Sequence, residues 1–273
     1  MSESMMLPKT PRFRASGRAA QTGRAGRVAC SRSPREQVDL EVVVPVYNEE
    51  ARIAETLEAL VAYLERQPLH SCVVVVDNGC ADRTLDRIDE IATTRVPIRV
   101  IACANKGKGA AIRRAMVSTR ARWIGFCDAD LATPIETIGP VVELLAAGHP
   151  IVIASRRVAG ASYVTAQPVV RRLGGMVFRS LAGLVVDGIA DTQCGFKFFD
   201  ADAAKALFAR SEASGFAFDV EILALARRDG LTITEVPVAW TDIDGSSLNP
   251  FVDGPRAVRE LMNVRSRLAT LPA

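Results

Sequence analysis

The sequence predicts an α/β fold in which a mostly parallel central sheet is flanked by helices. Two observations carry this prediction: β-branched runs such as 40–46 and 72–76 are apolar throughout, and segments with helical spacing separate them. Strands of this kind are buried on both faces, which is typical of a parallel sheet covered by helices. The 273 residues are 49% hydrophobic and 24% charged, a composition that excludes wholly disordered and collagen-like proteins.

Local patterns justify each element in chain order. Strands are expected at 40–46, 72–76, 98–103, 123–127 and 151–154, with helices at 49–66, 83–91, 109–119 and 135–147 between them. Pro134 favours the start of the last of these helices, because proline suits the first helical turn. After residue 160 we expect helices at 169–186, 217–228 and 255–271, a short strand at 195–199, and a strand within 231–240. Pro237 places that last strand near a sheet edge.

Charge and hydropathy divide the chain into three parts. Residues 1–36 carry eight basic and two acidic side chains without apolar periodicity, which predicts a disordered basic leader. A lipid-binding arm, a transit peptide and a wrongly assigned start are the alternatives. Residues 37–250 are expected to form the main domain, and 251–273 a C-terminal helix that packs on it or is amphipathic. No apolar stretch reaches about 18 residues, so no transmembrane helix is predicted.

Polar residues follow each of the first five predicted strands. They are Tyr47 to Glu49, Asp77 and Asn78, 105–107, Asp128 to Asp130, and 155–157. Since the carboxyl ends of parallel strands meet at one edge of the sheet, where ligands bind, we expect these side chains to form one site. The pattern favours an enzyme over a scaffold protein.

Asp128 and Asp130 are the candidate metal ligands. Two carboxylates at the end of an apolar strand suit Mg²⁺ or Mn²⁺, which bind through one or two carboxylates plus substrate phosphates. A solvated turn is the alternative. The chain has two histidines, so a His-rich metal site has little to use. Gly107 and Gly109 resemble part of a dinucleotide-binding loop, but Ile112 stands at its third glycine position, which argues against NAD.

Eight segments in order carry a family resemblance. They are 45–49 (PVYNE), 76–79 (VDNG), 105–109 (NKGKG), 128–134 (DADLATP), 155–156 (SR), 191–197 (DTQCGFK), 216–221 (FAFDVE) and 235–240 (EVPVAW). With these, residues 38–250 resemble the inverting family 2 glycosyltransferases of the GT-A fold. The resemblance is strongest to dolichyl- or polyprenyl-phosphate sugar synthases, particularly β-glucosyltransferases. It implies that 37–250 is a GT-A catalytic domain with a Rossmann-like, nucleotide-diphospho-sugar-binding sheet.

The resemblance also implies residue roles. The nucleotide would be bound by Pro45, Tyr47, Glu49, Asp77, Asn78, Lys106, Gly107 and Asp128, and the metal would be held by Asp128 and Asp130. The catalytic residues would be Asp130, Arg156, Asp191 and Lys197. The acceptor phosphate would be bound by Arg171 and Arg172. Asn78 stands where the family usually has a second acidic residue, so the resemblance leaves the identity of the nucleotide undecided. Asp191 is either a base toward a hydroxyl acceptor or an orienting group for Lys197 toward a phosphate.

The predicted reaction is metal-dependent, inverting transfer of a hexose, expected to be glucose from UDP-glucose, to a polyprenyl phosphate. A phosphate acceptor is largely a dianion near pH 7 and needs no general base. The alternatives are a soluble hydroxyl acceptor, a GDP-mannose donor, and a non-catalytic nucleotide-sugar sensor. Nucleic acid is not an expected partner, because aromatic residues make up 5%. We expect a cytoplasmic protein. Peripheral contact with the inner face of a membrane is the alternative.

Overall fold

The computed structural model describes residues 38–91, 95–163, 169–242 and 250–271, so the expected leader at 1–36 lies outside the described residues. Its central feature is a seven-stranded sheet in the order β3-β2-β1-β4-β7-β5-β8. The strands are β1 (Leu40–Val46), β2 (Ser71–Asp77), β3 (Ile98–Ala102), β4 (Trp123–Cys127), β5 (Ile151–Ser155), β7 (Phe196–Asp200) and β8 (Ile233–Pro237). β7 pairs antiparallel with both neighbours, and the other pairings are parallel.

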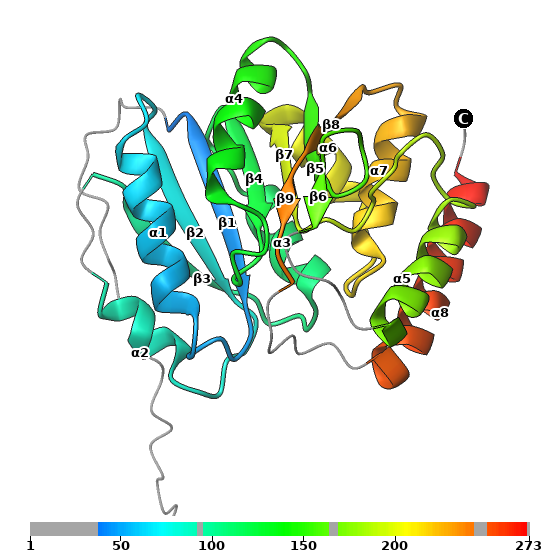
Figure 1. Cartoon of the computed structure of the whole chain (residues 1–273), viewed down its shortest axis with the longest axis horizontal. Coiled ribbons are helices and arrows are strands. Elements are labelled where there is room, and N and C mark those ends of the chain that lie inside the picture. The colour runs from blue at the N-terminus through cyan, green and yellow to red at the C-terminus, as the bar shows by residue number, and fades with distance from the viewer. Residues whose placement is uncertain (1–37, 92–94, 164–168, 243–249, 272–273) are drawn as a thin grey trace, which may run out of the picture. The chain divides into compact units, whose positions relative to one another are not determined.

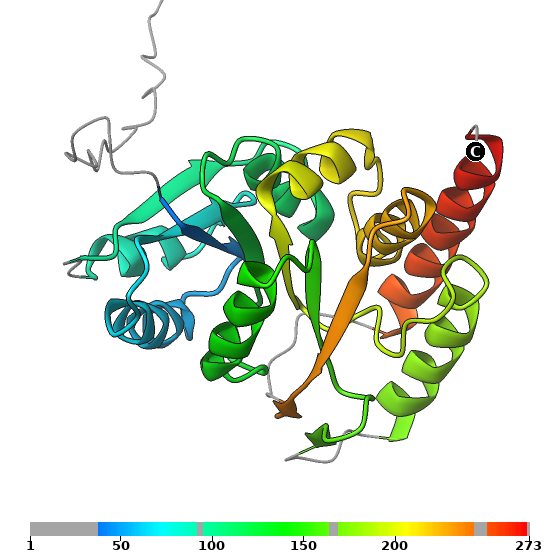
Figure 2. The same ribbon diagram turned by 90° about the horizontal axis from the view of Figure 1, so that it is seen from above.

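Helices cover both faces of the sheet, as Figures 1 and 2 show. One face carries α1 (Ile53–Glu65), α2 (Thr84–Asp89) and α4 (Ile138–Ala146), and the other carries α3 (Lys108–Met116), α6 (Ala201–Arg210) and α7 (Phe218–Arg228). Side chains of β1 alternate between the two cores: Val42 and Val44 pack with the first group, Val43 with the second. The sheet is thus buried on both faces, as its continuous apolar strands predict.

Two helices lie side by side beyond α7 (Figure 1). They are α5 (Val169–Ala182) and α8 (Pro250–Thr270), which contact each other. On α8, Leu261, Val264 and Leu268 are buried in the core that also holds α7. A second, two-stranded sheet pairs β6 (Ser162–Tyr163) with β9 (Ala239–Trp240).

The structure differs from the sequence prediction at three places. α6 follows β7 directly and was not predicted, although Asp200 caps it by accepting a hydrogen bond from the Asp202 amide at 3.0 Å. The helix expected at 135–147 begins with a 3-10 turn, η1 (Ile135–Thr137). The strand expected at 195–199 is β7, whose antiparallel direction no local pattern indicates.

Candidate active site

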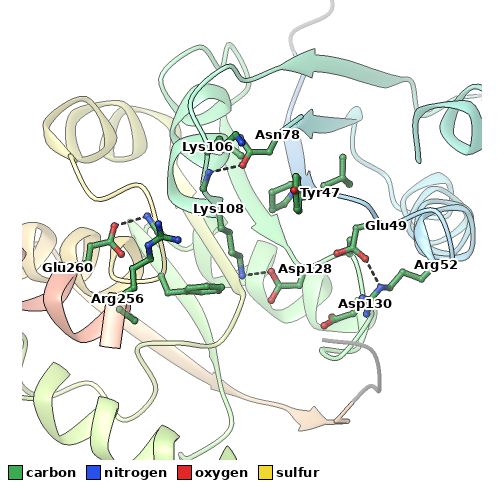
Figure 3. Close-up of a pocket in the computed structure, with 18 residues that line it drawn as sticks. Tyr47, Glu49, Arg52, Asn78, Lys106, Lys108, Asp128, Asp130, Arg256 and Glu260 are labelled. Carbon is green, nitrogen blue, oxygen red and sulfur yellow. Dashed lines mark hydrogen bonds and ion pairs between the residues drawn. The ribbon is translucent and has the colours of Figure 1, made fainter. Parts of the chain in front are cut away.

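A cavity of about 440 Å³ lies at the carboxyl ends of the strands, a size typical of small-molecule sites. Its wall contains eight of the predicted site residues: Pro45, Tyr47, Glu49, Asn78, Lys106, Gly107, Asp128 and Asp130. Figure 3 shows most of these side chains around the cavity, on the segments that follow β1, β2 and β4 and on the loop before α3. The rule that polar strand ends meet at one edge therefore places these residues correctly.

Asp128 and Asp130 project from the turn after β4. The Asp128 amide donates to the Gly195 carbonyl at 3.1 Å, and Asp130 accepts from the Ala132 amide at 3.0 Å. Leu131 has a φ of 56°, a region that costs a branched residue energy and clusters at functional sites. Burial, and then the neighbouring Asp128 carboxylate, raise the pKa of Asp130. Two carboxylates that repel each other in this way are suited to a shared cation.

Two cations face these carboxylates and were not among the predicted site residues. The Lys108 ammonium lies 2.5 Å from Asp128, and Arg52 lies 2.5 Å from Glu49 (Figure 3). Burial opposes the charge on Lys108, but Asp128 and the buried Asp219 outweigh it and raise the Lys108 pKa. Lys108 belongs to the NKGKG segment, so the sequence motif could have identified it as a site residue. Arg52 follows the PVYNE segment and belongs to no motif.

The start of α3 is closed to phosphate by the loop before α7. Gly109 and Ala110 both donate their amides to the Ser214 carbonyl, at 2.9 and 3.3 Å. Gly107, with a φ of 116°, has no room for a Cβ, which would lie 2.2 Å from the same carbonyl oxygen. A dinucleotide-binding loop needs these amides free for the pyrophosphate, so the geometry also argues against NAD.

Asn78 and Asp77 hold neighbouring loops together. The side-chain Nδ2 of Asn78 donates to the Asn105 carbonyl at 2.7 Å, and its Oδ1 accepts from the Gly107 backbone amide at 2.8 Å. An aspartate could not donate the first of these bonds, which explains an amide at this position. Asp77 accepts from the amides of Gly79 and Cys80 and does not line the cavity. Its predicted contact with the base stays a prediction.

The far wall of the cavity comes from α8 and the loop before α7. Glu260 accepts from the amides of Gly215 and Ala217 at 2.6 and 3.2 Å, which ties α8 to that loop. Arg256 of α8 lies on the same wall (Figure 3). Within the described residues, no ion pair of Lys106 or Arg256 is found. Nothing in the local sequence marks Arg256 or Glu260 as site residues, because both stand on an ordinary amphipathic helix.

The remaining predicted catalytic residues lie outside the cavity. Arg156 binds Asp191 through two side-chain bonds of 2.6 and 2.8 Å, and its guanidinium stacks 5.3 Å from the Trp240 ring. Lys197 is fully buried, where its ammonium contacts Asp219 and the Cys194 carbonyl, both at 2.6 Å. Both pairs join distant parts of the chain.

Two further residues, Arg171 and Arg172, were predicted to meet the acceptor. They fall in α5, where the structure describes the helix but not these side chains. Their role stays a prediction.

Removing the carboxylate of Asp191 should destabilise the protein in a pH-dependent way. Burial would raise the Asp191 pKa, but the hydrogen bonds and charge of Arg156 outweigh burial and lower it to about 2. Asp191→Asn leaves Arg156 buried without its partner, at a cost of about 3–5 kcal/mol at pH 7. A lowered pKa stabilises the fold above the ordinary value near 3.8, and this contribution is lost as pH falls through about 2.

Urea unfolding of both proteins at pH 7 and near pH 2.5 tests this. The difference in unfolding free energy should shrink at the lower pH, where Asp191 of the wild type starts to lose its charge. A difference below about 1 kcal/mol at pH 7, or an equal difference at both pH values, would contradict the assigned pair.

Two kinds of feature are absent from the described residues. No helix there is both long enough and apolar enough to cross a membrane. No group of three or more His, Cys, Asp or Glu side chains there is arranged to hold a metal ion by itself. Mg²⁺ commonly binds through one or two carboxylates together with waters and substrate phosphates.

This chain is similar in sequence to known glycosyl transferases. Residues 41–208 match the family model described as glycosyl transferase family 2. A dolichyl-phosphate beta-glucosyltransferase of Mus musculus is 34% identical over 254 residues, covering 87% of this chain and 78% of the relative. The protein of the same name from Dictyostelium discoideum is 30% identical over 256 residues, covering 87% and 77%.

Solved structures agree on the fold. Glucosyl-3-phosphoglycerate synthase of Mycobacterium tuberculosis, solved with Mn²⁺, UDP-glucose and phosphoglyceric acid, superposes with a TM-score of 0.65 at 20% identity. The match covers 86% of this chain and 81% of that structure. The predicted GT-A fold, with a mostly parallel sheet flanked by helices, is confirmed. The chain belongs to glycosyl transferase family 2 and is a glycosyltransferase.

Proposed function

We propose that this glycosyltransferase transfers glucose from UDP-glucose to a dolichyl-type polyprenyl phosphate, with inversion and with a divalent cation. The names of its relatives support the sugar and the acceptor. The ion pair of Asp191 with Arg156 favours a phosphate acceptor over a hydroxyl, because it removes Asp191 as the candidate base. A carboxylate with a pKa of about 2, bound on both oxygens by Arg156, is too weak a base to take a proton from a hydroxyl. A phosphate dianion needs no such base.

The residues present fit a divalent cation. Asp128 and Asp130 supply carboxylate oxygens, the ligands that Mg²⁺ and Mn²⁺ prefer. Burial, and then repulsion by Asp128, raise the pKa of Asp130, and a bound cation would counter both effects. When bound, the cation would supply charge neutralisation to the leaving diphosphate.

The other lining residues have distinct roles in the proposal. Lys106 and Arg256 are cations without an ion-pair partner among the described residues, and they suit a diphosphate. Tyr47, 54% exposed at the cavity, offers a ring for the base, while Arg52 holds Glu49 in place. Arg171 and Arg172 remain the candidates for the acceptor phosphate. A lipid acceptor implies peripheral contact with a membrane, and a cytoplasmic location remains part of the proposal.

A radiolabelled donor assay tests this function. UDP-[¹⁴C]glucose and GDP-[¹⁴C]mannose are offered separately with Mg²⁺ or Mn²⁺ and a short polyprenyl phosphate, and label is counted in the organic phase. We expect label in the organic phase from UDP-glucose, and we expect EDTA to abolish it. Label from GDP-mannose alone contradicts the donor, and donor consumption without organic-phase label contradicts the lipid acceptor.

Adding one methyl group behind Asp128 should disable the site. A Cβ at Gly195 would lie 1.9 Å from an Asp128 carboxylate oxygen, so Gly195→Ala must displace that carboxylate. A shift of about 1 Å at a catalytic group costs about 100-fold in rate, and we expect a loss of that size in kcat. Gly175→Ala is the matched control, because a Cβ there meets nothing within 4 Å. Near-normal kcat in Gly195→Ala would show that Asp128 is not required in its present position.

A further inference from the structure

The Lys108 ammonium occupies the position beside Asp128 where a cation is expected. It lies 2.5 Å from the Asp128 carboxylate, and its side chain is 23% exposed. The residue is the first of α3, whose start is anchored by the two amide bonds to the Ser214 carbonyl. The lysine therefore extends from a fixed point of the backbone to the carboxylate (Figure 3).

The surroundings stabilise the charge on Lys108. Asp219 is fully buried and attracts the lysine, while Asp219 itself is paired with Lys197 at 2.6 Å. On the other side of the cavity Arg52 pairs with Glu49 and also attracts Asp130. Lys108 thus offsets negative charge at Asp128 and Asp130, and this offset is lost when the lysine is replaced.

We propose that Lys108 is an internal counterion that keeps divalent cations away from Asp128 and Asp130 until a nucleoside diphosphate enters the cavity. This inference rests on the proposed function for its choice of ligand. A diphosphate brings negative charge that attracts the Lys108 ammonium away from Asp128, and it brings oxygens that complete the coordination of the metal. Free metal, in contrast, must displace a close ammonium without gaining phosphate ligands. Metal and nucleotide are therefore expected to bind cooperatively.

Direct binding of Mn²⁺ tests the inference without any turnover. The electron paramagnetic resonance signal of free Mn²⁺ falls when the ion is bound, and it is titrated against the full chain with and without UDP. The variants Lys108→Met and Lys108→Gln remove the charge. Lys205→Met is the matched control, because Lys205 is an exposed lysine of α6 that pairs only at 3.9 Å with Asp202. Thermal unfolding shows which variants are folded.

We expect weak Mn²⁺ binding by the wild type alone and stronger binding with UDP. In Lys108→Met and Lys108→Gln the affinity for Mn²⁺ alone should rise about tenfold or more, and the enhancement by UDP should shrink. Lys205→Met should behave as the wild type. Unchanged or weaker Mn²⁺ binding in both Lys108 variants overturns the inference. A gain in Mn²⁺ affinity without glucosyl transfer by the wild type supports the counterion and contradicts the proposed function, so the two failures are distinct.

Discussion

Replacing Asp130 by asparagine should reduce glucosyl transfer about 1,000-fold and leave the fold intact. Asparagine keeps the oxygen that accepts the Ala132 amide bond, so the turn after β4 is preserved. It loses the charge that, with Asp128, would hold the cation, and such a cation contributes several kcal/mol of charge stabilisation. Each 1.4 kcal/mol of that contribution is tenfold in rate. The measurement is kcat with saturating Mg²⁺ or Mn²⁺, alongside the midpoint of thermal unfolding.

A matched variant separates charge loss at this site from charge loss in general. Asp202 is 97% exposed on α6, remote from the cavity lining, and Asp202→Asn should keep wild-type kcat. If Asp130→Asn retained more than about a tenth of wild-type turnover, Asp130 would not be a ligand of the cation.

Replacing Lys197 by methionine should lower the free energy of unfolding by about 3–5 kcal/mol, because it leaves Asp219 charged and buried without its partner. Lys197 and Asp219 are 1% and 4% exposed at the side chain, and the ammonium also lies 5.6 Å from the Phe126 ring centre. Urea denaturation at pH 7 measures the loss. A loss below about 1 kcal/mol would mean that the pair does not stabilise the fold.

A double variant decides whether Lys197 acts in catalysis or only in the fold. Lys197→Met combined with Asp219→Asn removes both charges, and the stability should largely return because a neutral buried pair has no unpaired ion. Since Lys197 does not line the cavity, the double variant should keep kcat within about tenfold of the wild type. Asp219→Asn alone is the control, because Asp219 also attracts Lys108. A stable double variant without activity, beside an active Asp219→Asn variant, would instead place Lys197 at the acceptor, as the family resemblance implies.

Local patterns predict most of the sheet and the near wall of the cavity. The strand 40–46 could be predicted because a buried parallel strand is a continuous apolar run. The polar residues after it could be assigned to the site because ligands bind at the carboxyl ends of such strands. Asp128 and Asp130 follow in the same way.

Contacts between distant residues could not be predicted. Asp191 and Arg156 are 35 positions apart, and nothing in the sequence around either residue indicates that the two form an ion pair. Arg256 and Glu260 reach the cavity because α8 packs along α5 and α7, a tertiary arrangement with no local signal. The same holds for β7, whose direction depends on its two neighbours.

The cavity at the strand ends is proposed to bind the donor together with a metal, and a crystal structure of the protein with UDP and Mn²⁺ would decide this. We expect the nucleotide in the cavity lined by Tyr47 and Asn78, with Mn²⁺ in contact with Asp128 or Asp130 and with the diphosphate. A nucleotide bound elsewhere, or bound in the cavity with Mn²⁺ touching neither aspartate, would show that this cavity is not the shared site of donor and metal.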